Sequence, residues 1–246
     1  MASSHPPVVK KAMILAAGLG TRFKPWTDEH PKALAIVNGK SLLQRNIEYL
    51  QAYGIDDLVV NVHHFAGQIT EVLMAHRGWG SRITISDETS EVLETGGGLK
   101  KAAAHLGSSP FLLMNVDILT DLDLSALIRE HFQYRPIATL AVTDRTTSRY
   151  FLWDEEGELC GWRNTSTGQE RIVRPGQTLI QKAFSGIHVI DPAIFPLIRQ
   201  EGKFSTVDVY LDLAGTHAIR SFDHSHSRLI DVGKPESVEK AEQLFP

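Results

Sequence analysis

The alternation of apolar runs with amphipathic segments constrains the fold of this chain most. In the segment 41–50, for example, the apolar residues fall at positions 42, 43, 47 and 50, which is helical spacing, and Gly54 ends the helix. Strands separated by helices of this length indicate β-α-β units, because a crossover between parallel strands needs a dozen or more residues. The sequence therefore predicts an α/β protein, with strands at 12–17, 58–62, 83–85, 111–116 and 137–142 and helices at 41–50, 68–76, 98–106 and 124–134.

Residues 150–185 depart from this alternation. They are richer in polar residues and glycine, and their β-like pieces are short. We therefore expect an antiparallel excursion beside the main sheet, after which residues 186–190 return to the core as a strand. No internal repeat or linker interrupts the chain, which predicts one continuous domain over residues 11–246 behind a flexible lead-in at residues 1–10.

Composition argues against several classes of protein. The single cysteine, Cys160, leaves no internal disulfide and fits a reducing compartment. The formal net charge of −4, without a long run of lysine or arginine, argues against a nucleic-acid partner. No segment approaches the roughly 20 apolar residues that span a bilayer, and the first residues lack the apolar core of a secretory signal. We expect a cytoplasmic protein, a monomer or small homo-oligomer, that binds neither membrane nor nucleic acid.

The first apolar run opens into a glycine-rich turn that ends in cations. It reads LAAGLGTRFKPW at 15–26, and HPKAL follows at 30–34. Glycines let backbone amides approach phosphate oxygens closely, and Arg22 or Lys32 can neutralise the phosphate charge. The turn has neither the GxxxxGK[ST] pattern of a Walker loop nor the third glycine of the dinucleotide fingerprint. A tight strand–helix turn with surface cations is the alternative reading of these residues alone.

Two carboxylates follow apolar stretches later in the chain. Asp117 comes directly after the predicted strand 111–116, and Asp231 lies in LIDVGKPE at 229–236. Ligands bind beyond the carboxyl ends of the strands in an open α/β sheet, so Asp117 is predicted to lie where a ligand binds. Two carboxylates suit Mg²⁺, which takes few protein oxygens and keeps other positions for water and phosphate. The alternative for each aspartate is an N-cap of the element that follows.

Glycines also precede the predicted helix at 98–106, in the motif ETGGG at 94–98. Taken alone, three glycines before a helical run are a loop and an N-cap.

The segment LAAGLGTRFKPWTDEHPKAL resembles the signature of the sugar nucleotidyltransferase (nucleoside-diphosphate-sugar pyrophosphorylase) family. The resemblance extends from Lys11 to Leu244, because ETGGG and the two aspartate motifs follow in the order of the family. The form ETGGG is most similar to the N-acetylmuramate 1-phosphate uridylyltransferases of cell-wall sugar recycling. Val116 stands where many relatives have glycine, and Lys234 replaces their usual threonine.

The resemblance implies roles for the matching residues. The glycine-rich turn would wrap the triphosphate, Arg22 would hold the departing pyrophosphate, and Lys32 would lie against the phosphates at the reacting centre. Asp117 and Asp231 would bind Mg²⁺. Asp208 can equally be a surface or capping residue. The implied catalytic residues are Arg22, Lys32 and Asp117; those implied for nucleotide binding are Leu15, Ala16, Ala17, Gly18, Gly20, Thr21, Arg22, Glu94, Thr95, Gly96, Gly97 and Asn115; and those implied for the sugar phosphate are Lys182, Gly186 and Asp208.

The implied fold is a three-layer Rossmann-like nucleotidyltransferase fold, with a mixed, mostly parallel central sheet and a small antiparallel excursion. Its nucleotide-binding half would span residues 11–143 and its sugar-phosphate-binding half residues 144–246. The implied reaction is Mg²⁺-assisted transfer from UTP to N-acetylmuramate 1-phosphate. Three alternatives stay open: a hexose or heptose 1-phosphate acceptor, phosphocholine with CTP, and a catalytically silent regulatory protein that binds nucleotide sugars.

Overall fold

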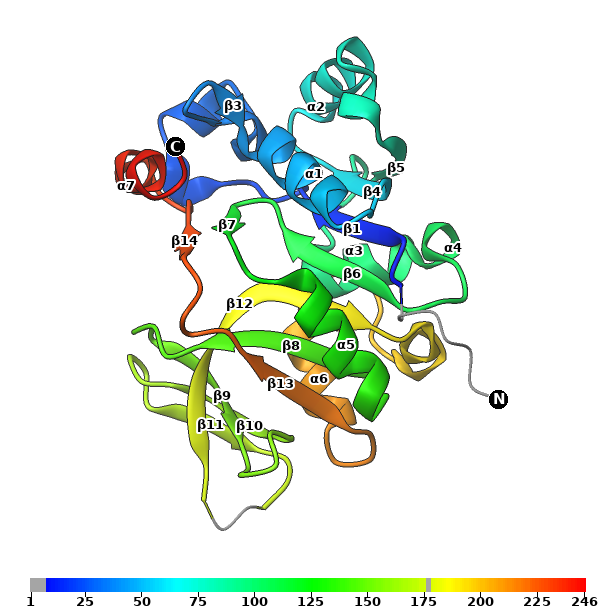
Figure 1. Ribbon diagram of the computed structural model, residues 1–246, viewed down its shortest axis with the longest axis vertical. Helices are drawn as coiled ribbons and strands as arrows, with labels where there is room; N and C mark the ends of the chain where they lie inside the picture. Colours follow the sequence, from blue (N-terminus) through cyan, green and yellow to red (C-terminus); the bar gives the residue numbers. More distant parts are fainter. Residues whose placement is uncertain (1–7, 176–177) are drawn as a thin grey trace.

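A ten-stranded mixed sheet forms the centre of the computed structural model, which describes residues 8–175 and 178–246. Residues 1–7 of the predicted lead-in lie outside the described residues. The strands of the sheet are β1 (Lys11–Leu15), β4 (Asp57–Val62), β5 (Arg82–Asp87), β6 (Phe111–Asn115), β8 (Ala138–Thr143), β9 (Arg149–Trp153), β10 (Leu159–Asn164), β11 (Gln169–Ile172), β12 (Ile180–Ile190) and β13 (Ile219–Asp223). They follow the order β11-β10-β9-β12-β6-β1-β4-β5, and β8 pairs with both β12 and β13 (Figure 1).

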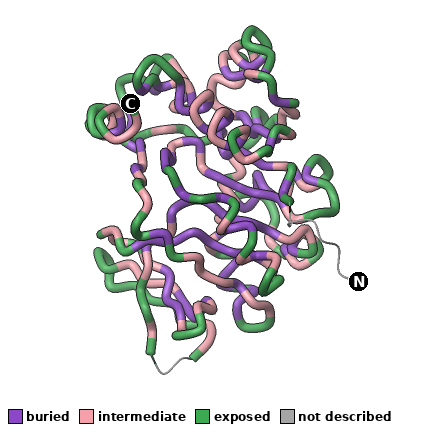
Figure 2. Tube along the Cα trace, in the orientation of Figure 1, coloured by how far each residue is buried: buried purple, intermediate pink, exposed green. Residues whose placement is uncertain are grey.

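The part of the sheet built from β5, β4, β1 and β6 is parallel. In β1, Met13 and Ile14 point to opposite faces, and both are fully buried. A strand that is buried on both faces has a continuous apolar sequence, which explains why β1 and β6 consist mostly of apolar residues. Figure 2 shows the same burial along the central strands, with exposed residues concentrated on the outer helices and the β9–β11 hairpins.

Helices cover both faces of the sheet. On the face that carries Ile14, apolar residues pack from α1 (Leu42–Ala52), α2 (Ala66–Ala75) and α5 (Leu124–Tyr134). On the face that carries Met13 they pack from α3 (Glu94–Lys101), α4 (Ala103–Leu106) and α6 (Thr206–Leu213). The α/β class and the three layers that the sequence predicts are confirmed.

Side-chain caps fix where several helices begin. The hydroxyl of Ser41 accepts from Gln44 N at 3.1 Å and starts α1, and Asp123 accepts from Ser125 N at 2.9 Å and starts α5. Such caps satisfy an amide that has no partner inside the helix. Short 3₁₀ helices complete the helical elements: η1 (Thr21–Phe23), η2 (Trp26–Asp28), η3 (Lys32–Leu34), η4 (Arg77–Gly80) and η5 (Pro192–Leu197).

Strand β12 joins the parallel part of the sheet to the antiparallel part. Its last residues pair antiparallel with β6, and its first residues pair antiparallel with β9. The change of partner falls at Gly186, whose φ of +74° interrupts the register against β8 between Phe184 and His188. The antiparallel excursion predicted from the sequence is confirmed as β9, β10 and β11. The core strand begins at Ile180 and not at Gly186, because its amino-terminal part extends the excursion.

Two small sheets flank the main one. Strand β7 (Ile118–Thr120) pairs antiparallel with β14 (Leu229–Asp231), and β2 (Ile36–Val37) pairs with β3 (Lys40–Ser41). Helix α7 (Glu236–Leu244) follows β14 and packs beside β2 (Figure 1). Across residues 8–175 and 178–246, the structure contains no helix that combines the length and the apolar character needed to cross a bilayer.

Candidate active site

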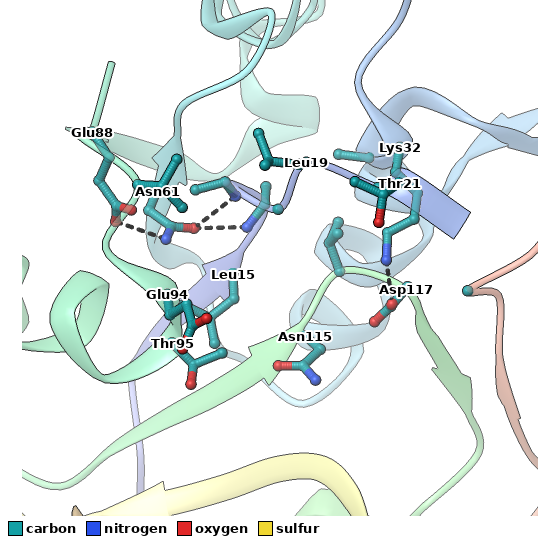
Figure 3. A pocket seen from close by; sticks show the side chains of 18 of the residues that line it. Leu15, Leu19, Thr21, Lys32, Asn61, Glu88, Glu94, Thr95, Asn115 and Asp117 are labelled. Carbon is teal, nitrogen blue, oxygen red and sulfur yellow. Dashed lines mark hydrogen bonds and ion pairs between the residues drawn. The ribbon is translucent and has the colours of Figure 1, made fainter. Parts of the chain in front are cut away.

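A cavity of about 520 Å³ lies at the carboxyl end of β1, where the glycine-rich turn leaves the sheet (Figure 3). Its volume is within the range of small-molecule sites. It opens at the edge where a parallel sheet presents its strand ends, as expected for an α/β fold. The residues that line it are Leu15, Ala16, Ala17, Gly18, Leu19, Gly20, Thr21, Arg22, Lys32, Ala33, Asn61, Glu88, Val92, Glu94, Thr95, Asn115, Val116, Asp117, Arg149, Lys203, Ser205 and Gly233.

The exit of β1 into the turn is held by Asn61 of the neighbouring strand β4. The Oδ1 atom of Asn61 accepts from Ala16 N at 2.7 Å and from Ala17 N at 3.3 Å, and its Nδ2 atom donates to Glu88 Oε1 at 2.8 Å (Figure 3). Glu88 is only 1% exposed, and this burial raises the pKa of its carboxyl above the usual range. The network fixes the backbone at the point where it begins to line the cavity.

Glycine occurs at positions 18 and 20 of the turn for different structural reasons. Gly20 has a φ of +61°, and a Cβ there would lie 2.8 Å from Thr27 Cγ2. Thr27 also donates to Gly20 O at 2.9 Å, so the turn closes tightly on this residue. At Gly18 no atom lies within 4 Å of the Cβ position. Gly20 therefore shapes the turn, whereas Gly18 keeps the cavity open.

Asp117 and Asp231 come together although they are far apart in the sequence. Strand β14 pairs with β7 so that Asp231 faces Ile118, and Val232 N donates to Asp117 O at 2.8 Å. Lys32, at the start of η3, forms an ion pair with Asp117; the two side chains are 15% and 13% exposed. A Cβ at Gly233 would lie 2.7 Å from Asp231 Oδ1 and 3.1 Å from Arg22 Nη2, so Arg22 reaches the same place.

The charge around Asp231 is only partly balanced. Burial raises the pKa of its carboxyl, and the nearby charge of Asp117 raises it further. Lys32, Arg22 and Arg145 act in the opposite direction. The Oδ1 atom of Asp231 is buried, and among the residues that the structure describes it has no hydrogen-bond partner. A buried carboxylate oxygen without a partner is costly unless a cation binds it.

The carboxylate oxygens of Asp117 and Asp231 suit a divalent cation. Within the described ranges 8–175 and 178–246, no group of three or more histidine, cysteine, aspartate or glutamate side chains gathers to hold a metal. Mg²⁺ commonly uses one or two carboxylates and takes its other ligands from water and phosphate. The N-cap alternative is wrong for both aspartates: Asp117 lies in the turn between β6 and β7, and Asp231 ends strand β14, whereas the N-cap of α7 is Pro235.

The ETGGG motif is itself helical, which corrects the predicted start of this helix at Gly98. Helix α3 runs from Glu94, and its three glycines are buried inside it. A Cβ at Gly96 would lie 2.5 Å from the Phe204 ring, one at Gly97 would overlap Gly202 O, and one at Gly98 would lie 2.6 Å from Glu88 Oε1. Glycine occurs in this helix because α3 packs too closely on its neighbours for any side chain.

Of this motif, Glu94 and Thr95 line the cavity, while Gly96 and Gly97 do not. The amides of Gly96 and Gly97 donate to Phe204 O at 2.9 and 3.2 Å. The hydroxyl of Thr95 accepts from Thr206 N at 2.9 Å. The amino end of α3 is thus attached to the segment 202–206, and a nucleotide-binding role for Gly96 and Gly97 stays a prediction.

The structure places the three predicted sugar-phosphate residues outside the cavity lining. Lys182 Nζ lies 2.5 Å from both Asp144 Oδ1 and Asp223 Oδ2. Gly186 packs behind Asn115, and Asp208 is exposed in the first turn of α6. Their roles stay predictions.

Several lining residues are absent from the sequence prediction: Asn61, Glu88, Arg149, Lys203 and Ser205. Asn61 had a signal, because it is the polar residue inside the apolar strand 58–62. Arg149, Lys203 and Ser205 had none, since they stand among other polar residues in segments of irregular texture.

Comparison with known proteins identifies the family of the chain. A family model described as nucleotidyl transferase matches residues 11–151. A curated relative, the N-acetylmuramate alpha-1-phosphate uridylyltransferase of Caulobacter vibrioides, is 48% identical over 110 residues, which cover 44% of this chain and 46% of that protein. The protein of the same name from Neisseria meningitidis is 42% identical over 116 residues, which cover 47% and 50%.

A solved structure, HddC from Yersinia pseudotuberculosis complexed with GMP-PN, is similar over 97% of this chain and 100% of its own, with a TM-score of 0.79 and 24% identity. The matched part of this chain spans about half the length of the two curated relatives. The family match covers the glycine-rich turn, α3 and Asp117, which are the elements that meet in the cavity. This chain belongs to the nucleotidyl transferase family.

Proposed function

We propose that this protein transfers a uridylyl group from UTP to N-acetylmuramate 1-phosphate, giving UDP-N-acetylmuramate and pyrophosphate. The observation that carries the proposal is the meeting of Arg22, Lys32 and Asp117 at one end of the cavity, with Asp231 beside them though outside the cavity lining. Two cations beside two carboxylates suit phosphate chemistry, since phosphate oxygens and a divalent cation can share this place.

The nucleotide is expected to lie along the glycine-rich turn. Its triphosphate would follow the backbone from Gly18 to Arg22, and its base and ribose would lie against Thr95, on the wall formed by α3. The choice of uracil and of N-acetylmuramate rests on the two curated relatives that carry this activity in their names.

In the proposed reaction an oxygen of the sugar phosphate attacks the α-phosphorus in line. A new P–O bond forms, the bond from the α-phosphorus to the bridging oxygen breaks, and pyrophosphate leaves with that electron pair. Arg22 and Lys32 offset the negative charge that develops on the phosphates, and the turn holds the triphosphate in register. No residue has to form a covalent intermediate.

Asp117 and Asp231 would hold Mg²⁺, which when bound offsets charge on the phosphate oxygens. The protein would act in the cytoplasm, in the recycling of cell-wall sugars.

The test is pyrophosphate release with purified protein. UTP, CTP, GTP and dTTP are each combined with N-acetylmuramate 1-phosphate, hexose and heptose 1-phosphates and phosphocholine, with Mg²⁺ and with EDTA. We expect Mg²⁺-dependent release, highest with UTP and N-acetylmuramate 1-phosphate. Release that is highest with another pair would overturn the proposed substrates and keep the reaction. Nucleotide binding without release from any pair would overturn the reaction and favour a regulatory protein.

A further inference from the structure

The two lysines that line the cavity each have a carboxylate partner. Lys32 pairs with Asp117, and Lys203 Nζ lies 3.7 Å from Glu94 Oε1. Among the described residues, 8–175 and 178–246, neither Arg22 nor Arg149 has a carboxylate within 4 Å of its guanidinium or a hydrogen-bond acceptor for it, although both line the cavity. Arg22 lies close to Asp231 at Gly233, where the phosphates are proposed to react, whereas Arg149 comes from β9.

The base of the Arg149 side chain is well anchored. Arg149 is the first residue of β9 and stands opposite Asn164 in the β9–β10 hairpin. The turn before it is held by Thr147 N, which donates to the Tyr150 hydroxyl at 3.0 Å, and by Thr165 N, which donates to Ser148 O at 2.8 Å. The guanidinium is exposed and extends from an ordered hairpin into the cavity.

Arg149 approaches from the part of the sheet that lies across β12 from the nucleotide strands (Figure 1). On this side of the molecule Lys182, the cation expected from the sequence, is already neutralised by Asp144 and Asp223. Arg149 therefore lines the cavity from β9, which β12 separates from β6 and β1, the strands that lead into Asp117 and the glycine-rich turn. From this side it can meet a second anionic group of a bound ligand.

The acceptor in the proposed reaction carries two anionic groups. Its phosphate must lie at the reacting centre, because a phosphate oxygen attacks the α-phosphorus. Its second anion is the carboxylate of the lactyl ether, which lies on the sugar ring and which N-acetylglucosamine lacks. A planar guanidinium can bind such a carboxylate through two parallel hydrogen bonds.

We propose that Arg149 is a specificity-determining residue that binds the carboxylate of an acidic sugar 1-phosphate. This inference rests on the proposed function, since it concerns the acceptor of the same site. It explains how the cavity would separate N-acetylmuramate from N-acetylglucosamine, whose 1-phosphates differ only in the lactyl group. A charge-assisted hydrogen bond that one ligand makes and the other cannot make gives discrimination between them.

The test is calorimetric binding of N-acetylmuramate 1-phosphate and N-acetylglucosamine 1-phosphate, with Mg²⁺ and a non-hydrolysable UTP analogue present. The variants are Arg149→Gln, Arg149→Lys and the control Arg199→Gln, an exposed arginine outside the cavity. We expect the wild type to bind the acidic sugar more tightly. Arg149→Gln should reduce that preference by roughly 10- to 100-fold, Arg149→Lys should restore part of it, and the control should keep it.

Two results would overturn the inference. An equal loss of affinity for both sugars in Arg149→Gln would assign the guanidinium to the shared phosphate, and an unchanged preference would show that it contacts neither ligand. Pyrophosphate release by the wild type is measured separately. If the preference for the acidic sugar depends on Arg149 but the wild type releases no pyrophosphate, the transfer reaction alone is rejected. If the wild type releases pyrophosphate but the preference does not depend on Arg149, the inference alone is rejected.

Discussion

Two walls of the cavity are built in different ways. The loop wall, residues 15–33, is one stretch of chain held on strand β4 by Asn61. The distal wall consists of Arg149, Lys203 and Ser205, which come from a hairpin and a loop separated by β10, β11 and β12. Contiguous residues can be read as a motif, whereas dispersed residues meet only after folding. The difference teaches that a cavity wall made of consecutive residues can be recognised in the sequence, whereas a wall made of dispersed residues cannot.

The largest expected effect tests whether activity at the loop wall depends on the carboxylates of Asp117 and Asp231. Asp117→Asn or Asp231→Asn should lower turnover by about 10³-fold, because either change removes a charge that would hold Mg²⁺. Pyrophosphate release over a Mg²⁺ series measures this, with the exposed Asp56→Asn as the matched control. Near-normal activity of the variants at saturating Mg²⁺ would refute the metal assignment.

A second change separates glycines that shape the fold from a glycine that shapes the cavity. Gly97→Ala should lower the free energy of unfolding by about 1–3 kcal/mol, because its Cβ would overlap Gly202 O and crowd Leu93. Gly18→Ala should alter it by less than about 1 kcal/mol and instead raise the KM for nucleotide, since its Cβ would enter the cavity.

Urea unfolding and nucleotide-dependent kinetics of both glycine variants check this pair. If Gly18→Ala were the less stable protein, the roles assigned to the two glycines would be reversed.

Acid should destabilise the region of the sheet around β8, β12 and β13 before it destabilises β1 and β4. Burial lowers the pKa of His131 to about 4, of His188 to about 3 and of His224 to about 4, from an ordinary value of 6.5. These histidines pack around β8, β12 and β13. Because their folded-state pKa values lie below the unfolded value, stability is intact above pH 6.5. It falls as the pH drops towards 4, by at most about 1.4 kcal/mol per pH unit for each histidine.

Hydrogen exchange at pH 7 and pH 5 measures this order of opening. We expect protection in β8 and β13 to fall more than in β1 and β4. Equal losses in both parts of the sheet would contradict a local origin.

The smallest expected effect concerns the ion triad of Lys182. Lys182→Met should lower the free energy of unfolding by about 1 kcal/mol or less, because Asp144 and Asp223 are 66% and 45% exposed and water screens them. The acceptor KM, measured on the same variant, tests the sugar-phosphate role that the sequence predicts. A KM raised more than about tenfold would support that role and extend the distal wall to Lys182.

The sequence was most informative where local chemistry decides the structure. The apolar runs of β1 and β6 and the helix at 124–134 could be predicted because burial on both faces, or on one stripe, has its own spacing. The position of the glycine-rich turn at a ligand site could be predicted because its glycines and Arg22 lie close together in the sequence. The start of α3 could not, because close packing against Phe204 and Gly202 outweighs the poor helix propensity of glycine.

The acceptor side was less accessible for a related reason. Lys182 lies in the amino-terminal part of β12, and the fold sets two carboxylates against it, Asp144 directly after β8 and Asp223 at the end of β13. Arg149 is the first residue of an ordinary strand and carries no local signal. The pairing of β9 with β12 places that strand beside the parallel part of the sheet.

The pairing of β14 with β7 also has a consequence in time. A nascent chain that has already formed β1, β4 and β6 holds the glycine-rich turn, Lys32 and Asp117, yet it lacks Asp231 until more than a hundred further residues have been synthesised. Until then Lys32 is the charge beside Asp117, and the strong anionic pair does not exist. The two aspartates can therefore come together only after β14 has been synthesised and has paired with β7.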